Sequence, residues 1–303
     1  MVTRSVYKDI TWIDLESPTR EEVREIMEEF HVDPLAADEL LSPTLRPKVD
    51  LYENLIYLIV HFPLVVHTHG RSGAQEIDFI IGKNFIITTH YELVDPLHEF
   101  SRVFEVNSIL DKSNIGTHAG FVFFYILREL YRNVMLQLDE LDRKLEDIEE
   151  RIFKGEEAFM VREISKVNRD LLNVRQAIRP HKEILESFEI AATRFFGDDF
   201  LYHVRAISGE YYRVYNVLES QKETLVDLRE TNDALLTTKT NEIMKILTVM
   251  AFVILPPGLI AGLFGMNVKP PFLDTENHFW LIVVVMMSSM IFTFVLMKWK
   301  KWI

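Results

Sequence analysis

The chain has no cysteine among its 303 residues, so disulfide bonds and zinc sites built from thiolates are excluded. It also lacks a glycine-rich loop ending in Lys-Ser or Lys-Thr, and we therefore expect no ATP-driven step. No nucleophile, base or metal motif stands at a spacing typical of catalysis, which predicts a protein that is not an enzyme and carries no cofactor. The first ten residues, MVTRSVYKDI, have no apolar core or cleavage site and do not predict a signal peptide.

Positive charge is also scarce. The chain holds 33 Lys and Arg against 46 Asp and Glu, and residues 245–303 contain five of the lysines but only two of the acids. The first 244 residues are therefore strongly acidic. Such a surface disfavours nucleic acid as a partner and favours cations, although ordinary solubility explains most of these charges equally well.

Charge is absent from two stretches near the C-terminus, residues 246–266 and 279–297. Each is close to the ~20 residues that a helix needs to cross the ~30 Å hydrocarbon core of a bilayer. We therefore predict two transmembrane helices in contact with lipid.

The lysines around these stretches predict their orientation. The connector contains only Lys269, whereas the tail KWKKWI contains Lys298, Lys300 and Lys301. Positive loops stay on the cytoplasmic side. The sequence thus predicts a multi-pass protein of the cell membrane, with both termini in the cytoplasm and the connector outside.

The predicted fold class is an α+β membrane protein with three segments. We expect a cytoplasmic α/β domain in residues 1–115, a cytoplasmic region of long helices in residues 116–244 and a two-helix transmembrane domain in residues 245–303. Within the last segment, the predicted parts are a first helix at about 245–266, an outer loop at 267–278, a second helix at about 279–297 and a basic tail at 298–303.

The first segment mixes strand and helix patterns. ITWIDLE, NLIYLIVHF, EIDFIIG and NFIITTH are short runs of β-branched and aromatic residues, which are typical of strands. SPTREEVREIMEEF predicts a helix with Ser17 as N-cap and Pro18 at the first helical position. Together these patterns predict layers of strands and helices.

From about residue 118, apolar residues recur in steps of three and four, as in helices that pack like coiled coils. FKGEE and FFGDD predict the turns between three such helices. The third has no obvious stop from Asp199 to Met266, and a continuous helix of that length would span about 100 Å. The three series are Phe124, Leu127, Tyr131, Val134, Leu138, Leu141, Leu145, Ile148 and Ile152; then Met160, Ile164, Val167, Leu171, Val174, Ile178, His181, Leu185 and Phe188; then Phe200, Val204, Ile207, Tyr211, Val214, Leu218, Gln221, Leu225, Leu228, Asn232 and Leu235.

The same spacing continues through the first apolar stretch and selects one polar or small-residue face. Small residues allow transmembrane helices to pack closely, and they also leave room for a water-filled conduit if several chains surround it. Pro256 removes a backbone hydrogen bond, which in lipid requires a neighbour or water as a substitute. The face consists of Asn241, Met244, Thr248, Ala251, Leu255, Gly258, Gly262 and Gly265.

These residues resemble a known family. TNEIMKILTVMAFVILPPGLIAGLFGMN, a short loop, a second apolar helix and the tail KWKKWI are similar to the membrane signature of CorA-type divalent-cation channels. The family hallmark, Gly-Met-Asn at the end of the first membrane helix, is matched by Gly265, Met266 and Asn267. The resemblance lies in motifs over residues 238–303 and in architecture over the remainder.

The resemblance implies a homopentamer that imports Mg²⁺, and also Co²⁺ or Ni²⁺, passively. It implies a ring of Asn267 amides that holds a hydrated Mg²⁺ at the outer mouth, which fits the reluctance of Mg²⁺ to lose water. It also implies a pore in which apolar rings close the path by dewetting, and it selects Leu247 where the spacing selects Thr248. The implied pore residues are Asn241, Met244, Leu247, Ala251, Leu255 and Gly258.

The sequence departs from the family in two places. An acidic loop often follows the asparagine, but here Lys269 comes first, and Asp274 and Glu276 lie further along. The related ZntB-type Zn²⁺ transporters therefore remain an alternative, although Met266 favours magnesium. The second departure concerns a regulatory Mg²⁺ site, because Ala206 stands where the family has a carboxylate on the stalk helix. Acids near this position that could substitute are Asp198, Asp199 and Glu210. For each of them, a solvated surface acid is the simpler interpretation.

Other polar clusters have plain interpretations. We expect His61, His67 and His69 to be surface histidines beside a turn. His67 and His69 would lie on one side of a strand, but a third ligand that converges on this pair is missing, so they do not predict a metal site. Residues 138–157 contain nine acids and four bases, typical of the wet face of a long helix, which in a ring of five would also concentrate cations. A membrane-tethered scaffold without ion flux is the distant alternative from another class.

Overall fold

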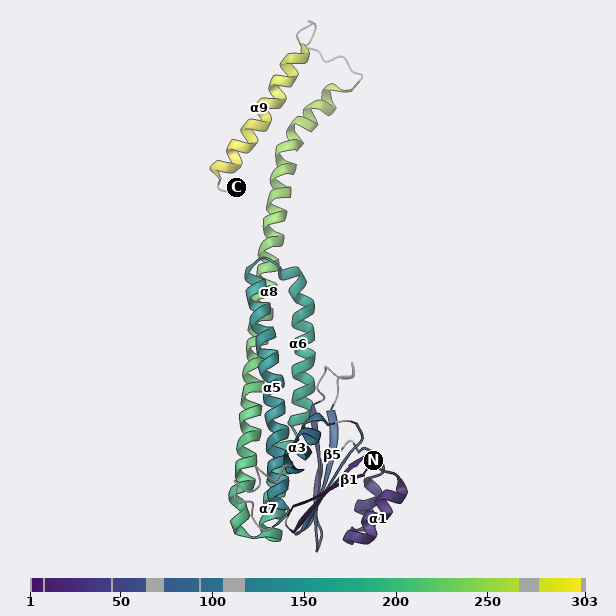
Figure 1. The fold of residues 1–303 in the computed structure, drawn as a ribbon. Coiled ribbons are helices and arrows are strands. Elements are labelled where there is room, and N and C mark those ends of the chain that lie inside the picture. Colours follow the sequence, from purple (N-terminus) through teal and green to yellow (C-terminus); the bar gives the residue numbers. More distant parts are fainter. Residues whose placement is uncertain are drawn as a thin grey trace. The chain divides into compact units, whose positions relative to one another are not determined.

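The computed structural model describes residues 2–7, 9–44, 46–63, 74–92, 94–105, 118–266 and 278–300 (Figure 1). It separates into two compact units, Met1–Arg229 and Glu230–Ile303. The three segments predicted from the sequence are functional divisions and stay predictions.

The first unit contains a six-stranded sheet with the order β1-β2-β6-β5-β4-β3. The β2 and β6 strands are parallel, and the other neighbours are antiparallel. The strand patterns read from the sequence are confirmed as β2, β4, β5 and β6, whereas β1 and β3 were not predicted because their residues are largely polar or half-buried. The strands are β1 Val2–Tyr7, β2 Ile10–Glu16, β3 Lys48–Leu51, β4 Ile56–Pro63, β5 Ala74–Ile81 and β6 Phe85–His90.

Two short helices, α1 (Arg20–Phe30) and α2 (Pro34–Glu39), pack on one face of the sheet. The predicted N-cap of α1 is wrong by two residues. Thr19 forms the cap, with its Oγ1 accepting from Glu22 N at 3.3 Å and its own N donating to Glu22 at 2.8 Å. Ser17 has a left-handed φ of 44° and donates to the carbonyl of Tyr91 at 2.9 Å instead, so it ties the strand end to the sheet.

The long helices lie on the opposite face of the sheet from α1 (Figure 1). Aromatic pairs join the two layers: the Phe79 and Phe123 rings are 5.1 Å apart, and the Phe62 and Tyr131 rings are 5.4 Å apart. The helices are α3 Asp95–Glu105, α5 Gly120–Phe153, α6 Glu157–Ile178, α7 His181–Phe196, the short 3₁₀ helix η1 Asp198–Phe200 and α8 Leu201–Phe264.

The apolar spacing predicted the packing of these helices well. Every position of the three series is buried except Leu235, which is half-buried. The second series was expected to form one helix, but Pro180 separates α6 from α7. Because proline has no N–H to donate, it ends the hydrogen-bond ladder while the apolar spacing continues across the break.

The second unit contains the end of α8 and the helix α9, His278–Trp299. Each holds a stretch long and apolar enough to cross a membrane. The helix α8 is continuous over 64 residues and includes Pro256 and Pro257, which confirms the predicted long helix. The two membrane helices read from the sequence are thus confirmed as helices, with α9 extending two residues beyond the expected end.

Candidate functional site

The candidate site is the face of α8 selected by the apolar spacing, between residues 241 and 266. An α-helix turns by about 100° per residue, which places the six predicted pore residues within an arc of about 120°. All six are exposed in the single chain; Met244, Leu247 and Leu255 have 56%, 55% and 64% of their surface exposed. The six therefore form one continuous stripe that no described part of the chain covers.

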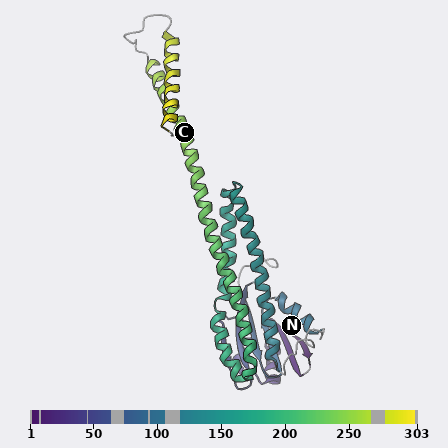
Figure 2. The ribbon, with the colours of Figure 1, turned by 90° about the vertical axis from the view of Figure 1, so that its left-hand side faces the viewer.

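The opposite side of the same helix is half-buried between residues 249 and 260, whereas Ile246 on that side is 56% exposed. Its half-buried residues fall around a direction almost opposite to the predicted pore stripe. Figures 1 and 2 show α9 running back alongside this end of α8, and α9 has a matching stripe. We infer that the two helices turn these stripes toward each other. The α8 stripe is Val249, Val253, Pro256, Pro257 and Ile260, and the α9 stripe is Ile282, Met286, Ser289, Thr293 and Met297.

Hydroxyl groups in these helices bond to their own backbones. Thr248 donates to the carbonyl of Met244 at 2.7 Å, and Thr293 donates to that of Ser289 at 2.8 Å. Within the described residues, the side-chain amide of Asn241 has no partner in the chain. Asn241 is thus a free polar group on the uncovered face.

The two prolines free two carbonyl oxygens of α8. Pro256 and Pro257 have no N–H, so the carbonyls of Phe252 and Val253 lose their helical donors. Within a bilayer such oxygens require a neighbouring chain or water. This need agrees with a helix that belongs to an assembly or borders a wet interior.

At the C-terminal end of α8, the backbone leaves too little space for a side chain on residue 265. The N–H of Gly265 donates to the carbonyl of Ala261 at 2.9 Å, and a Cβ on Gly265 would lie 2.9 Å from that same oxygen. Any other residue would therefore force the backbone to shift. Met266 is 58% exposed and follows directly. Asn267, Lys269, Asp274 and Glu276 lie outside the described residues, so their predicted roles stay predictions.

The basic tail is described only in part. Lys298 lies in the last turn of α9, and Lys300 Nζ is 5.9 Å from the ring centre of Trp299. Lys301 lies outside the described residues. The cytoplasmic position predicted for these three lysines stays a prediction.

The acids suggested as substitutes for a regulatory site do not converge within one chain. Asp198 and Asp199 are exposed in η1, and Glu210 is paired with Arg213 at 3.2 Å. Eleven residues separate Asp199 from Glu210, which corresponds to about 16 Å along a helix. In the part of the chain that the structure describes, no three His, Cys, Asp or Glu side chains gather as a metal site. Ala206 is half-buried between them.

The prediction for His61 as a surface residue is wrong. It is half-buried on β4, with Nε2 3.0 Å from the carbonyl of Thr44 and 3.2 Å from Glu76. Its own carbonyl accepts from Nε2 of His181 at 2.8 Å. Because side chains alternate along β4, His61 points to the face of the sheet that the segment after α2 covers. The sequence around His61 did not indicate that this segment would cover it. His67 and His69 lie outside the described residues.

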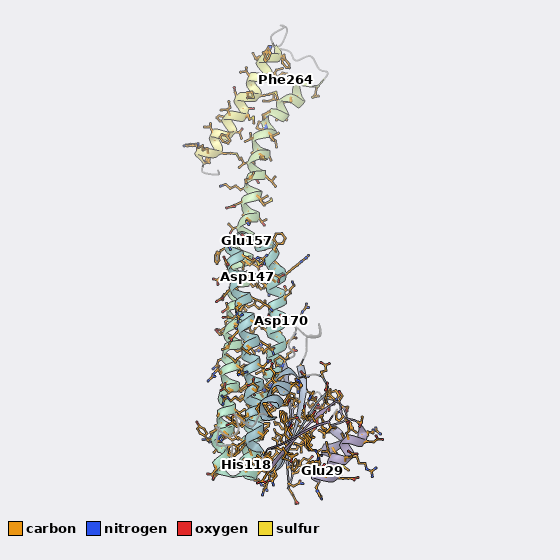
Figure 3. The ribbon with its side chains drawn as sticks, in the orientation of Figure 1. Glu29, His118, Asp147, Glu157, Asp170 and Phe264 are labelled. Atoms are coloured by element: carbon orange, nitrogen blue, oxygen red, sulfur yellow. The ribbon has the colours of Figure 1, made fainter. Side chains whose placement is uncertain are left out.

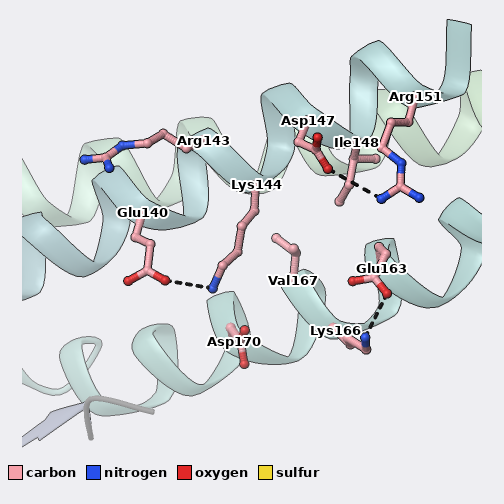
Figure 4. Close-up of a pocket in the computed structure, with 10 residues that line it drawn as sticks. All are labelled: Glu140, Arg143, Lys144, Asp147, Ile148, Arg151, Glu163, Lys166, Val167 and Asp170. Atoms are coloured by element: carbon pink, nitrogen blue, oxygen red, sulfur yellow. Dashed lines mark hydrogen bonds and ion pairs between the residues drawn. The ribbon is translucent and has the colours of Figure 1, made fainter. Parts of the chain in front are cut away.

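Most charged residues of the run 138–157 are exposed, which confirms a wet helix face, but Glu157 at its end is only 5% exposed and belongs to α6. Figure 3 places Asp147, Glu157 and Asp170 toward the end of α5 and α6 far from Glu29 and His118. A groove of about 450 Å³ between α5 and α6 is lined by four acids and four bases (Figure 4). Its pairs include Lys144 with Glu140 at 3.1 Å and Lys166 with Glu163 at 2.7 Å. Exposed pairs of this kind contribute little to stability.

Comparisons with known proteins agree with this architecture. A family model described as CorA-like Mg²⁺ transporter protein matches residues 7–299. The cobalt/magnesium transport protein CorA of Thermotoga maritima is 23% identical over 298 residues, which cover 97% of this chain and 83% of that protein.

Solved structures show the same fold. The complete structure of the CorA magnesium transporter from Methanocaldococcus jannaschii has a TM-score of 0.84 at 18% identity, and the match covers 99% of this chain and 94% of that chain. The ZntB cytoplasmic domain from Vibrio parahaemolyticus has a TM-score of 0.55 at 14% identity, covering 77% of this chain and 90% of that chain. These likenesses confirm the predicted fold class.

Proposed function

The chain belongs to the CorA-like Mg²⁺ transporter family, and from this premise we propose that it is a divalent-cation channel of the cell membrane. In this proposal Mg²⁺, and also Co²⁺ or Ni²⁺, enters passively through a homopentamer with both termini of each chain in the cytoplasm. The pore is lined by the stripe of α8 that carries Asn241, Met244, Leu247, Ala251, Leu255 and Gly258.

The observation that carries this proposal is the division of α8 into two faces. We infer that the half-buried face meets α9. The opposite stripe, in which Asn241 and small residues are interspersed with Met244, Leu247 and Leu255, is not covered by the described residues of the single chain. Two helices of one chain cannot enclose a pore. A ring of copies, each turning this stripe inward, would cover it and enclose a path.

Ion selection is assigned to the outer mouth. Gly265, Met266 and Asn267 form the filter, where neutral amide oxygens contact the water shell of the ion. Mg²⁺ would therefore be recognised before it loses water. Further in, rings of Leu247 and Leu255 would close the path by excluding water, without a charged plug.

The driving force is sufficient without ATP. A divalent ion that crosses an inside-negative membrane gains about 4.6 kcal/mol per 100 mV, since each elementary charge gains about 2.3 kcal/mol. Lys298, Lys300 and Lys301 would ring the cytoplasmic exit. Regulation by internal Mg²⁺ through Asp198, Asp199 or Glu210 would require carboxylates from neighbouring chains.

A Zn²⁺ transporter is the second candidate, supported by the likeness to the ZntB cytoplasmic domain. Met266 in the predicted filter favours magnesium. Uptake of Mg²⁺, Co²⁺, Ni²⁺ and Zn²⁺ should be measured one ion at a time in vesicles containing the purified protein, with and without a pH gradient. Mg²⁺ uptake that is independent of the pH gradient is expected; Zn²⁺ uptake that requires the gradient would favour the second candidate.

The filter assignment is tested in the same vesicles. Asn267→Ala should abolish selective Mg²⁺ uptake, because it removes the amide that contacts the hydrated ion. Asn54→Ala is a matched control, since Asn54 lies on a turn of the first unit and donates to the carbonyl of His31. Equal uptake by the wild type and Asn267→Ala would remove the filter. No uptake of any of the four ions would favour a membrane-tethered scaffold.

A further inference from the structure

Two carboxyl groups are buried side by side in the sheet of the first unit. Glu76 and Asp78 are two positions apart on β5, so their side chains point to the same face of the sheet, the one covered by α1 and α2. Glu76 is 5% exposed and Asp78 is 0% exposed. Two adjacent buried carboxylates are costly unless each charge has a partner.

Glu76 has the better set of donors. Both of its oxygens accept from the backbone N of Thr44, at 2.9 and 2.7 Å, and Nε2 of His61 lies 3.2 Å away. Thr44 belongs to the segment that connects α2 to β3. The carboxylate of Glu76 therefore fastens this connector to the sheet.

Asp78 receives tyrosine hydroxyls rather than a backbone N–H, from Tyr57 and from Tyr91 after β6. The hydroxyl of Tyr57 donates to Oδ2 at 3.3 Å, and Oδ1 is buried without a hydrogen-bond donor. Glu76 is within hydrogen-bonding reach of Asp78. If Asp78 carries a proton, its hydroxyl donates to Glu76, and the unpartnered atom is satisfied. The ionised alternative leaves two negative charges in contact.

The surrounding charges do not offset a second negative charge. The groups that face the pair are Tyr57 and His61 on β4, Tyr91 after β6, Glu39 on α2 and Lys48 on β3. The Lys48 ammonium is already shared by Glu39 at 2.8 Å and Asp50 at 2.7 Å. Burial first, and the Glu76 charge second, raise the pKa of Asp78 well above its usual range.

We propose that Glu76 and Asp78 form a buried proton-binding site, in which one proton is shared between two carboxyl groups and holds the Thr44 connector on the sheet. A proton suits this place better than a metal ion. His61 lies beside Glu76, but within the described residues no three His, Cys, Asp or Glu side chains are placed to hold a metal ion. A Mg²⁺ ion also keeps several of its waters, and the fully buried Asp78 does not reach water.

The sign of the pH effect follows from the site. The folded domain keeps a proton that an unfolded aspartate loses above its usual pKa of 3.8. Stability therefore falls as pH rises from about 4 toward the folded pKa of Asp78, and above that pKa the loss is complete. Loss of the proton leaves negative charges on both Glu76 and Asp78. Their repulsion should weaken the hydrogen bonds that the backbone N–H of Thr44 donates to Glu76.

Asp78→Asn tests this proposal in the full chain in detergent. The amide of asparagine donates to Glu76 as the protonated acid does, but it needs no proton. The thermal midpoint of the variant should exceed that of the wild type at neutral pH by at least about 2 °C, and its decline with pH should be smaller. Asp38→Asn, at an exposed carboxyl of α2, should behave as the wild type. A lower midpoint with an unchanged pH slope would overturn the proposal.

Two further measurements keep the test independent of how the variant folds. Infrared spectra of the wild type at neutral pH should contain the carbonyl stretch of a protonated carboxylic acid, which Asp78→Asn should lack. Hydrogen exchange at the Thr44 amide should speed up with pH more than the chemical rate alone requires. A wild type without the acid band would contradict the proton assignment, and neither measurement depends on ion transport.

Discussion

Tyr131→Phe should destabilise the first unit by an amount that the structure allows us to estimate. Both ring nitrogens of His181, which is 1% exposed, are engaged: Nε2 faces the carbonyl of His61 at 2.8 Å, and Nδ1 faces the hydroxyl of Tyr131 at 2.7 Å. A carbonyl only accepts, so Nε2 carries the proton and Nδ1 accepts from Tyr131. The phenylalanine variant leaves Nδ1 buried and unpaired.

An unsatisfied buried acceptor costs about 1–3 kcal/mol. In a domain of about 150–250 residues, each kcal/mol shifts the thermal midpoint by about 2–4 °C, which predicts a decrease of about 2–12 °C. The assay is thermal unfolding of the purified full chain in detergent. Tyr212→Phe is the control, because this tyrosine is 46% exposed. Equal midpoints for Tyr131→Phe and Tyr212→Phe would refute the hydrogen-bond assignment.

The same geometry sets the effect of acid. Burial lowers the pKa of His181 from 6.5 to about 4, outweighing the contribution of the His61 carbonyl. The folded state therefore resists protonation, and stability is lost as pH falls from about 6.5 to about 4. The full loss is about 3 kcal/mol, since one pKa unit corresponds to about 1.4 kcal/mol. His181→Gln should lose less stability than the wild type over this range, and an equal loss would contradict the buried neutral imidazole.

Three further changes have expected outcomes. Burial alone would lower the pKa of His90, but the hydrogen bonds of its ring to Asp14 at 3.3 Å and to a backbone carbonyl outweigh burial and raise this pKa. The stability of the wild type should therefore fall as pH rises through the folded pKa of His90. Asp14→Asn should reduce this dependence on pH in thermal unfolding. Thr19→Ala should cost about 0.5–2 kcal/mol in denaturant unfolding through loss of the α1 cap. Leu255→Asn should raise basal Mg²⁺ flux in vesicles by weakening an apolar ring, whereas Ile246→Asn on the opposite side of α8 should not.

The helical part of the fold was predictable because its signal is periodic. Steps of three and four identified every buried position of α8, including the polar members Gln221 and Asn232, and most of those in α5 and α6. They missed others, such as Phe123 and Ile126 in α5 and Ile184 in α7. The break at Pro180 was missed because the spacing continues across it, so only the missing N–H marks the boundary. Periodicity therefore predicts which face of a helix is buried, whereas the position at which a helix ends has to be predicted from the chemistry of single residues.

The polar interior of the sheet was not predictable from the sequence. The positions of Glu76, Asp78 and His61 read as an ordinary alternating strand pattern, and their burial depends on α2 and its connector folding over them. The cap of α1 shows the same limit on a smaller scale: Ser17, Pro18 and Thr19 all suit a helix start, and the bond from Ser17 to Tyr91 decides among them. Tertiary contacts settled what local propensity left open.

The candidate ion pathway was predicted as far as helix geometry reaches. Spacing and family resemblance placed Asn241, Ala251 and Leu255 on one face, and the structure leaves that face uncovered. The choice between close packing and a conduit depends on neighbouring chains, which no pattern within one chain specifies. Asn267 is predicted by motif alone.

The central claim is that Mg²⁺ crosses along the uncovered stripe of α8. The chain has no cysteine, so a single introduced thiol is the only reactive one in each copy. Asn241→Cys, Ala251→Cys and the opposite-face control Ile246→Cys should be placed in vesicles, treated with a small cationic thiol reagent and compared for Mg²⁺ uptake. Block at positions 241 and 251 with uptake preserved at position 246 is the predicted result. Block at position 246 alone, or at none of the three, would contradict the pathway.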